Sequence, residues 1–285
     1  MIWILDSINE LNQVTPSSFN VYLKGGTCVQ HFLRSEAQRF SKDLDLGVVF
    51  RNEILETEKS RLSNFRIIEA YINKLNKHLS KSGYTEDNGL VSARQGIPES
   101  WIICYDRFYK AKHSVPRYHG LQRKKGNWVM VEFSTLEYDP KFASQKIKLL
   151  PALYSGIEIE FPCATRSRIL ADKTIAMAGE KYGEREEIKD VLDVYTLLRN
   201  KEFDNDIQEA CRLIKSYADR KEVELSRMLN RAKKTVSRLA EEMTDERLAT
   251  DVNALLPRER RFGAIDEWKK LCEELKDRLS SFPVK

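Results

Sequence analysis

Two carboxylates two positions apart are the residues in this chain that most directly suggest chemistry. Asp43 and Asp45 flank Leu44, and the apolar, β-branched residues up to Phe50 predict a strand. Residues two apart on a strand face the same side of a sheet, where like charges repel unless a cation neutralises them. Mg²⁺ or Mn²⁺ binds such carboxylates together with substrate phosphates. We therefore expect a metal site here, the alternative being an exposed polar strand face.

A pair of glycines lies upstream of these acids. Lys24, Gly25, Gly26 and Thr27 follow a short apolar run and lead into a predicted helix. Because glycine has no Cβ, its backbone N–H group can come close to an anion, and a helix N-terminus favours negative charge. The sequence thus predicts a phosphate-binding turn, although a plain tight turn has the same sequence signature.

A third acid is expected on a neighbouring strand. Glu132 stands between the apolar residues Val131 and Phe133, which places it on the face opposite to theirs. Asp106 is a competing candidate. Either could equally be a surface acid.

Positive charge is concentrated between residues 105 and 148. The chain as a whole carries +5, whereas this stretch holds ten basic and four acidic side chains, with aromatic residues between them. Such a stretch suits a phosphate backbone and exposed bases. We expect Arg123, Lys124 and Lys125 to bind RNA, while a solvated loop between strands is the alternative.

Strand and helix signals alternate in the first part of the chain. Apolar residues recur every three or four positions from 53 to 81, which predicts a long amphipathic helix. Strands are expected at 44–50, 101–108, 128–134 and 157–161, the last one closed by Pro162.

The remainder of the chain is predicted to be helical. Thr165 is a suitable N-cap for a helix over 166–179, and a second helix is expected over 186–199. Residues 201–285 contain no strand-like run, and their charges nearly cancel. The sequence predicts an α+β protein with an α/β lobe over 1–160 and a helical lobe over 161–285.

Composition excludes several classes of protein. At 285 residues with 41% hydrophobic and 32% charged side chains, the chain is long enough to fold around its own core. No apolar run approaches the ~20 residues that cross a membrane, and the first residues do not resemble a signal peptide. The five cysteines contain no C-x-x-C pair, which disfavours a disulfide framework or a zinc site. We expect a cytoplasmic protein without a membrane partner.

Three separated motifs resemble those of a known family. Lys24-Gly25-Gly26-Thr27 and Arg39-Phe40-Ser41-x-Asp43-x-Asp45 are similar to the signature of the AbiEii/MenT nucleotidyltransferase toxins, which belong to the DNA-polymerase-β-like superfamily. Ala171-Asp172-Lys173 resembles the later lysine motif, and residues 189–195 resemble the R-D-x-x-D motif with Lys189 in place of Arg. Cys28-Val29 stands where Ala-Leu is usual. The resemblance covers residues 20–200.

The resemblance implies a polymerase-β-like fold and transfer of a nucleotide from an NTP to an acceptor, the 3′ end of tRNA in related toxins. It also implies a cognate antitoxin of the AbiEi type. Asp43 and Asp45 would be catalytic metal ligands, with Glu132 as the third. Lys24, Gly25, Gly26, Thr27 and Ser41 would bind the nucleotide, and Lys173 would contact its β/γ-phosphates. Asp190, and less directly Asp193, would orient Lys173 or contact the acceptor, unless they form a packing ion pair.

Three other functions compete with RNA modification. The chain could transfer AMP to a protein, could bind RNA without catalysis, or could be a metal-dependent nuclease, because paired carboxylates also serve phosphodiester hydrolysis. The intact acids, glycines and lysine disfavour a dead enzyme, and the glycine turn disfavours a nuclease.

Overall fold

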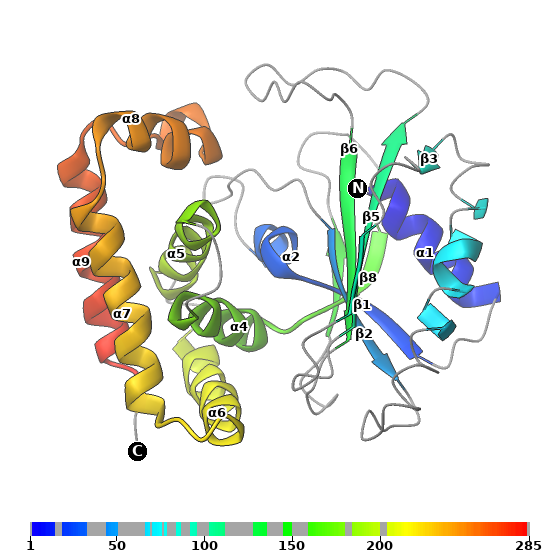
Figure 1. Ribbon diagram of the computed structural model, residues 1–285, viewed down its shortest axis with the longest axis horizontal. Helices are drawn as coiled ribbons and strands as arrows, with labels where there is room; N and C mark the ends of the chain where they lie inside the picture. Colours follow the sequence, from blue (N-terminus) through cyan, green and yellow to red (C-terminus); the bar gives the residue numbers. More distant parts are fainter. Residues whose placement is uncertain are drawn as a thin grey trace. The chain divides into compact units, whose positions relative to one another are not determined.

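Two compact units make up the protein, whose structure is a computed structural model (Figure 1). The first unit comprises Met1–Thr27 and Lys42–Ala164, and the second comprises Cys28–Ser41 and Thr165–Lys285. The first unit contains a mixed sheet with helices and the second contains helices, so the expected α+β class is confirmed. The structure describes residues 2–14, 19–32, 44–50, 66–68, 70–75, 77–78, 84–86, 92–95, 103–111, 128–135, 145–149, 159–179, 184–199 and 204–283.

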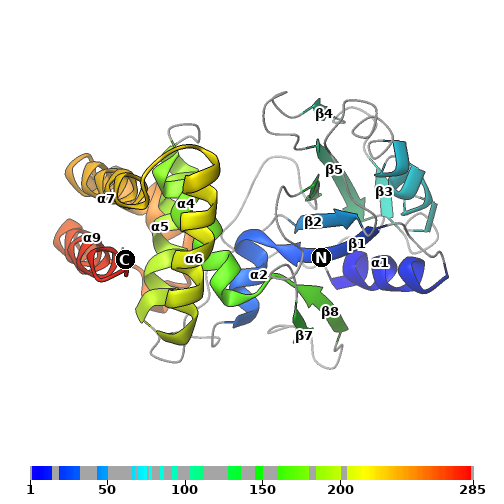
Figure 2. The ribbon, with the colours of Figure 1, turned by 90° about the horizontal axis from the view of Figure 1, so that it is seen from below.

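One sheet contains all the described strands of the first unit (Figure 2). The strands are β1 (Phe19–Lys24), β2 (Leu44–Phe50), β3 (Tyr84–Glu86), β4 (Ser92–Gln95), β5 (Ile103–Ala111), β6 (Trp128–Thr135), β7 (Gln145–Leu149) and β8 (Ile159–Cys163). Their order is β3-β5-β6-β2-β1-β8-β7, and β4 also pairs with β5. β1 runs antiparallel to β2 but parallel to β8, and β2 runs parallel to β6. Asp45, the candidate acid within β2, therefore lies in the middle of the sheet.

The expected strands β2, β5, β6 and β8 are present, but the end of β8 differs from the prediction. Pro162 lies inside this strand, paired with Lys146 of β7, instead of closing it. A proline can remain in a strand where the sheet does not need its missing N–H. The strands β3, β4 and β7 were not predicted, because each has only three to five residues, which is too few for a clear strand pattern.

An aromatic cluster holds two helical segments on the sheet. The described residues between 66 and 78 are helical, as expected within 53–81. Tyr71 packs edge-on against Phe19 of β1, with 5.0 Å between the ring centroids, and lies 6.4 Å from Phe133 of β6. Its hydroxyl donates a hydrogen bond to Asn12 of α1 (Ile2–Val14) at 2.9 Å, and burial raises the pKa of this phenol. The cluster fixes the core on which β1 and β2 rest.

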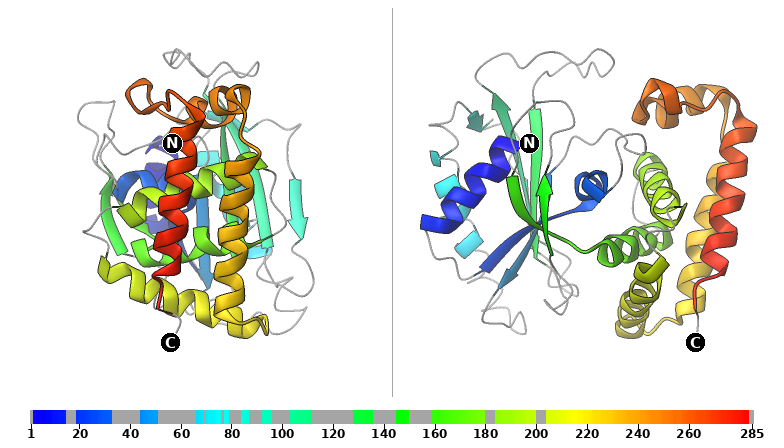
Figure 3. Two further views of the ribbon diagram at one scale, coloured as in Figure 1. Left: turned by 90° about the vertical axis from the view of Figure 1, so that its left-hand side faces the viewer. Right: turned by 180° about the vertical axis from the view of Figure 1, so that it is seen from behind.

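All described secondary structure of the second unit beyond Thr165 is helical, in agreement with the prediction (Figure 3). They are α4 (Arg166–Ala178), α5 (Glu184–Arg199), α6 (Asp204–Arg220), α7 (Leu225–Glu241), α8 (Asp245–Arg247), η4 (Leu248–Val252), η5 (Asn253–Leu255), η6 (Arg258–Arg260) and α9 (Ile265–Ser280). Thr165 caps α4 by accepting a hydrogen bond from the Arg168 N–H at 3.2 Å.

Trp268 of α9 is a large side chain in the buried core of the second unit. Its side chain is fully buried, and its indole N–H donates to the Leu239 carbonyl of α7 at 3.2 Å. This bond satisfies the one polar group of a large apolar side chain, which fixes how α7 and α9 pack. Across the described residues, no helix combines the length and the apolar character that a bilayer crossing would demand.

Candidate active site

A close contact between Gly25 and Asp45 defines the first candidate group. Gly25 directly follows β1 and opens α2 (Gly25–Phe32) with φ of +67°, in the left-handed region that favours glycine. The position that a Cβ would occupy at Gly25 lies 2.6 Å from the Asp45 Cγ and 2.7 Å from its Cβ. Any other residue would therefore collide with the aspartate and strain the backbone. The glycine allows the Asp45 carboxylate to lie directly against the start of α2.

The strand register places further candidate residues next to Asp45. Lys24 of β1 is paired with Asp45 on one side, and Glu132 of β6 is paired with it on the other. Asp106 of β5 is in turn paired with Glu132. Adjacent strands are ~4.8 Å apart, so Glu132 stands one strand from Asp45 and Asp106 stands two. Of the two candidate third acids, Glu132 is therefore at the nearer position.

A second candidate group, formed by a lysine and two aspartates, lies within the second unit. The Lys173 ammonium of α4 forms an ion pair and hydrogen bond with Asp190 of α5, and its Nζ is 3.5 Å from Asp193 Oδ2. The exposed fractions of these side chains are 15% for Lys173, 11% for Asp190 and 1% for Asp193. The expected proximity of Lys173 and Asp190 is thus present, and Asp193 is too buried to contact a substrate in this arrangement.

Gln30 is a member of this group that the sequence did not suggest. Its side-chain amide donates to Asp193 Oδ1 at 3.5 Å, and its side chain is buried. Gln30 lies three residues after Thr27 on the same short helix, and both side chains are buried. A buried amide requires a hydrogen-bond partner, but this burial is known only from the structure. Gln30 and Lys173 together hold the two oxygens of Asp193.

The lysine motif also contains a residue with a different contact. Asp172 accepts a hydrogen bond at 2.9 Å from Nε of Arg168, one turn earlier on α4. The side chain of Arg168 is only 3% exposed, so this pair fixes a buried cation on α4. Asp172 is thereby a structural neighbour of Lys173.

Several expected site residues lie outside the described part of the chain. They are Ser41, Asp43, Arg123, Lys124 and Lys125. For Glu132 the structure gives the strand position alone. Within the described residues, no three His, Cys, Asp or Glu side chains are grouped so that they could hold a metal ion. Asp45 contributes the kind of hard oxygen donor that Mg²⁺ and Mn²⁺ prefer, and it is described as half-buried beside the glycine turn.

Comparisons with known proteins give the family of the chain. The family model "Nucleotidyl transferase AbiEii toxin, Type IV TA system" matches residues 15–274. The crystal structure of an antigenic nucleotidyltransferase-like protein from Paracoccidioides brasiliensis matches with a TM-score of 0.37 and 11% identity, over 92% of this chain and 96% of that one. No curated protein matches. The family model alone carries the assignment, since it spans most of the chain.

Proposed function

Because the chain belongs to the AbiEii nucleotidyltransferase toxin family of type IV toxin–antitoxin systems, we propose that it transfers the NMP of an NTP to RNA, with the 3′ acceptor end of tRNA as the main target. The contact between Gly25 and the Asp45 carboxylate is the observation that carries this proposal. It combines a turn suited to phosphates with a metal-binding oxygen, which are the two parts that nucleotide transfer needs.

The carboxylates of the first unit would bind the metal. Asp43, Asp45 and Glu132 are the proposed ligands, with Glu132 preferred over Asp106 because it is paired directly with Asp45. Bound Mg²⁺ or Mn²⁺ supplies charge that gathers the triphosphate and offsets negative charge developing during in-line displacement. The oxygen donors of Asp45 fit such an ion.

The start of α2 would hold the triphosphate. Gly25, Gly26 and Thr27 form the first turn of this helix, at the positive end of its dipole, and Lys24 directly precedes them. Ser41 is the further proposed hydrogen-bond donor to the β/γ-phosphates. These contacts would hold the triphosphate in one position. The α-phosphate would then have few other orientations and would be presented for attack.

Lys173 would contribute a positive charge to the β/γ-phosphates, with Asp190 as its catalytic partner. In the free protein its ammonium is already paired with Asp190 and lies near Asp193. We propose that Asp190 and Asp193 position this ammonium. Binding of an NTP would then shift its hydrogen bonds partly toward phosphate oxygens, a charge-assisted contact for which lysine is well suited.

RNA is the proposed acceptor because of the charge carried by residues 105–148. A stretch of +6 with interleaved aromatic rings suits a phosphate backbone and splayed bases. The proposed partners are therefore an NTP, RNA and a cognate AbiEi-type antitoxin. We propose that the protein acts on them in the cytoplasm.

Labelled NTPs incubated with the protein, Mg²⁺, total RNA and a cell extract test the proposal. We expect label in RNA of tRNA length. Label in protein bands alone would favour an AMP-transferring enzyme, RNA fragments would indicate a nuclease, and retarded but unlabelled RNA would indicate a binding module. Each of these three results contradicts RNA modification.

The charged segment provides a second test of the acceptor. Neutralising Arg123, Lys124 and Lys125 together should weaken RNA binding and flatten the log–log dependence of the affinity on salt by up to about three. NTP binding should not change. An equal affinity and salt slope in the triple variant and the parent would remove this segment from the acceptor route.

A further inference from the structure

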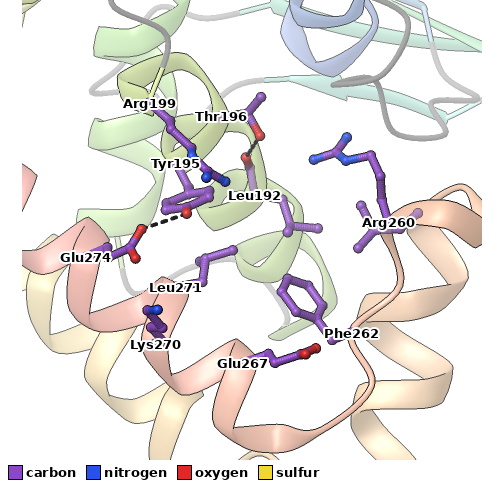
Figure 4. Close-up of a pocket in the computed structure, with 11 residues that line it drawn as sticks. Leu192, Tyr195, Thr196, Arg199, Arg260, Phe262, Glu267, Lys270, Leu271 and Glu274 are labelled. Atoms are coloured by element: carbon purple, nitrogen blue, oxygen red, sulfur yellow. Dashed lines mark hydrogen bonds between the residues drawn. The ribbon is translucent and has the colours of Figure 1, made fainter.

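The second unit contains a pocket that the proposed reaction does not use (Figure 4). It has a volume of about 320 Å³ and lies between α5, the segment around η6 and the start of α9. Small-molecule sites have volumes of roughly 300–1,000 Å³, so this pocket has room for one small ligand.

The pocket lies on a different face of α5 from the Lys173 group. Four residues of α5 line the pocket, and their spacing of three and four positions places them along one stripe of the helix. They are Leu192, Tyr195, Thr196 and Arg199. Asp190 and Asp193, which contact or approach Lys173, are outside that stripe. A ligand here would be a second one, separate from the NTP.

Two arginines give the pocket a positive end. Figure 4 shows the guanidinium groups of Arg199 and Arg260 turned toward each other across it. Burial lowers the pKa of the Arg260 guanidinium, and the positive charge of Arg199 lowers it further. Two guanidinium groups so placed repel one another, and an oxyanion between them would relieve this repulsion through charge-assisted hydrogen bonds.

The acids that line the pocket have other hydrogen-bond donors. Glu267 accepts from the Gly263 N–H at 2.7 Å, and Glu274 accepts from the Tyr195 hydroxyl at 2.8 Å. Lys270 adds a third cation to the lining. The lining therefore holds three cations and two acids, so its balance of charge is positive. The Arg199 guanidinium lies over the Tyr195 ring, 5.9 Å from its centroid.

The rest of the lining is apolar. Leu192, Leu256 and Leu271 are buried, and the half-buried ring of Phe262 packs edge-on against Trp268 with 5.9 Å between centroids. Such a surface suits a flat, weakly polar ring system. Cations at one end and an aromatic, leucine-lined surface beside them match a ligand with an anionic group attached to a planar body.

We propose that this pocket binds a single nucleotide, with its phosphate between Arg199 and Arg260 and its base over the leucines and Phe262. The nucleotide could be a free nucleoside monophosphate or the terminal residue of an RNA strand, since both present the same chemistry.

Equilibrium dialysis of the full chain in EDTA tests this proposal apart from metal-dependent NTP binding. The probes are the four nucleoside monophosphates, inorganic phosphate, adenosine and an RNA hexanucleotide. We expect saturable binding of at least one monophosphate, with phosphate and adenosine each weaker by roughly tenfold or more. Tighter binding of the hexanucleotide that Arg260→Gln weakens would identify an RNA end as the ligand of the pocket. Tighter binding of the monophosphate would identify a free nucleotide.

Matched arginine variants locate the binding. Two variants, Arg260→Gln and Arg199→Gln, remove one guanidinium group each. Each variant should weaken nucleotide binding by roughly tenfold. Arg258→Gln, an exposed arginine of the same short helix that does not line the pocket, should leave it unchanged. Absence of saturable binding by any nucleotide probe, or an equal loss in Arg258→Gln, would overturn the proposal. Circular dichroism confirms that each variant is folded.

Discussion

The two candidate groups of this protein handle charge in opposite ways. In the first unit, the half-buried carboxylate of Asp45 lies against a glycine turn, at a register position paired with another acid. In the second unit, the carboxylates of Asp190 and Asp193 are nearly covered and share the ammonium of Lys173. In the first group, Asp45 stands at a register position between Lys24 and the second acid, Glu132. In the second group, one ammonium lies close to both acids.

This difference gives the two groups different responses to substitution. Like charges held together destabilise a fold until a metal ion binds them. A covered ion pair, in contrast, becomes strongly destabilising only when one partner is removed. We therefore expect substitutions in the first group to affect activity and those in the second to affect folding as well.

The largest effect is expected from Asp45→Asn. Loss of a metal-binding oxygen should reduce nucleotide transfer about ten-thousandfold, equivalent to about 5 kcal/mol of barrier. The free energy of unfolding should stay equal or rise, because one of the neighbouring acids is neutralised. Transfer assays and urea unfolding measure the two quantities, with Glu160→Gln, an exposed acid of β8, as the control. Loss of activity with a large loss of stability would instead mark Asp45 as structural.

Lys173→Met tests the second group. Removing the ammonium leaves Asp190 and Asp193 uncompensated, which should lower the free energy of unfolding by about 3–5 kcal/mol. The double variant Lys173→Met/Asp190→Asn should recover part of this loss, since one uncompensated charge disappears. Chemical denaturation measures both, and Lys215→Met on the exposed face of α6 is the control. An unchanged unfolding midpoint in Lys173→Met would mean that the pair does not stabilise the unit.

Nucleotide affinity tests whether Lys173 contributes to NTP binding. Titration of a non-hydrolysable NTP with metal into the folded fraction of Lys173→Ala should show binding weaker by about 1.5–3 kcal/mol, the range for a charged hydrogen bond. If both the affinity and the turnover match those of the parent, Lys173 has no part in nucleotide binding.

Gly25→Ala should have a smaller effect on stability. A left-handed conformation costs a residue with a Cβ about 1–2 kcal/mol, and the new methyl group must displace Asp45. Transfer should fall with it, because Asp45 moves. Gly263→Ala is the matched control, since its nearest neighbour would be the Glu267 carboxylate at an ordinary 3.8 Å. Equal behaviour of the two alanine variants would show that the glycine turn does not position Asp45.

The smallest effect concerns the closed interior of the second unit. Burial raises the pKa of the Cys211 thiol to about 11 and that of Cys272 to about 12, so both stay protonated at pH 9. Alkylation at pH 9 should therefore modify them much more slowly in the native protein than after denaturation. Peptide mapping by mass spectrometry measures this ratio. Rapid native labelling of either thiol would show that the interior opens.

The sequence predicted those parts of the molecule that depend on local pattern. The glycine turn, strand β2, the Thr165 cap and the helices α4 and α5 follow from residue types and spacing along a few turns. The motif resemblance also placed Lys173 near Asp190, although the role of that pair stays a prediction.

Features that depend on distant residues could not be predicted in the same way. The choice between Glu132 and Asp106 depends on strand order and register, which are set by packing across the sheet. Gln30 joins the Lys173 group only because α2 approaches α5 within the folded second unit. The pocket beside α5 likewise combines this helix with residues more than fifty positions later in the chain.

Transfer from NTPs labelled at either the α- or the γ-phosphate tests the central claim most directly. With Mg²⁺ and total tRNA, we expect the α-label to enter RNA with release of pyrophosphate, the γ-label to stay out, and Asp45→Asn to abolish incorporation. Incorporation of the γ-label would show phosphoryl instead of nucleotidyl transfer. Undiminished α-labelling by Asp45→Asn would contradict the role of the carboxylate at the glycine turn.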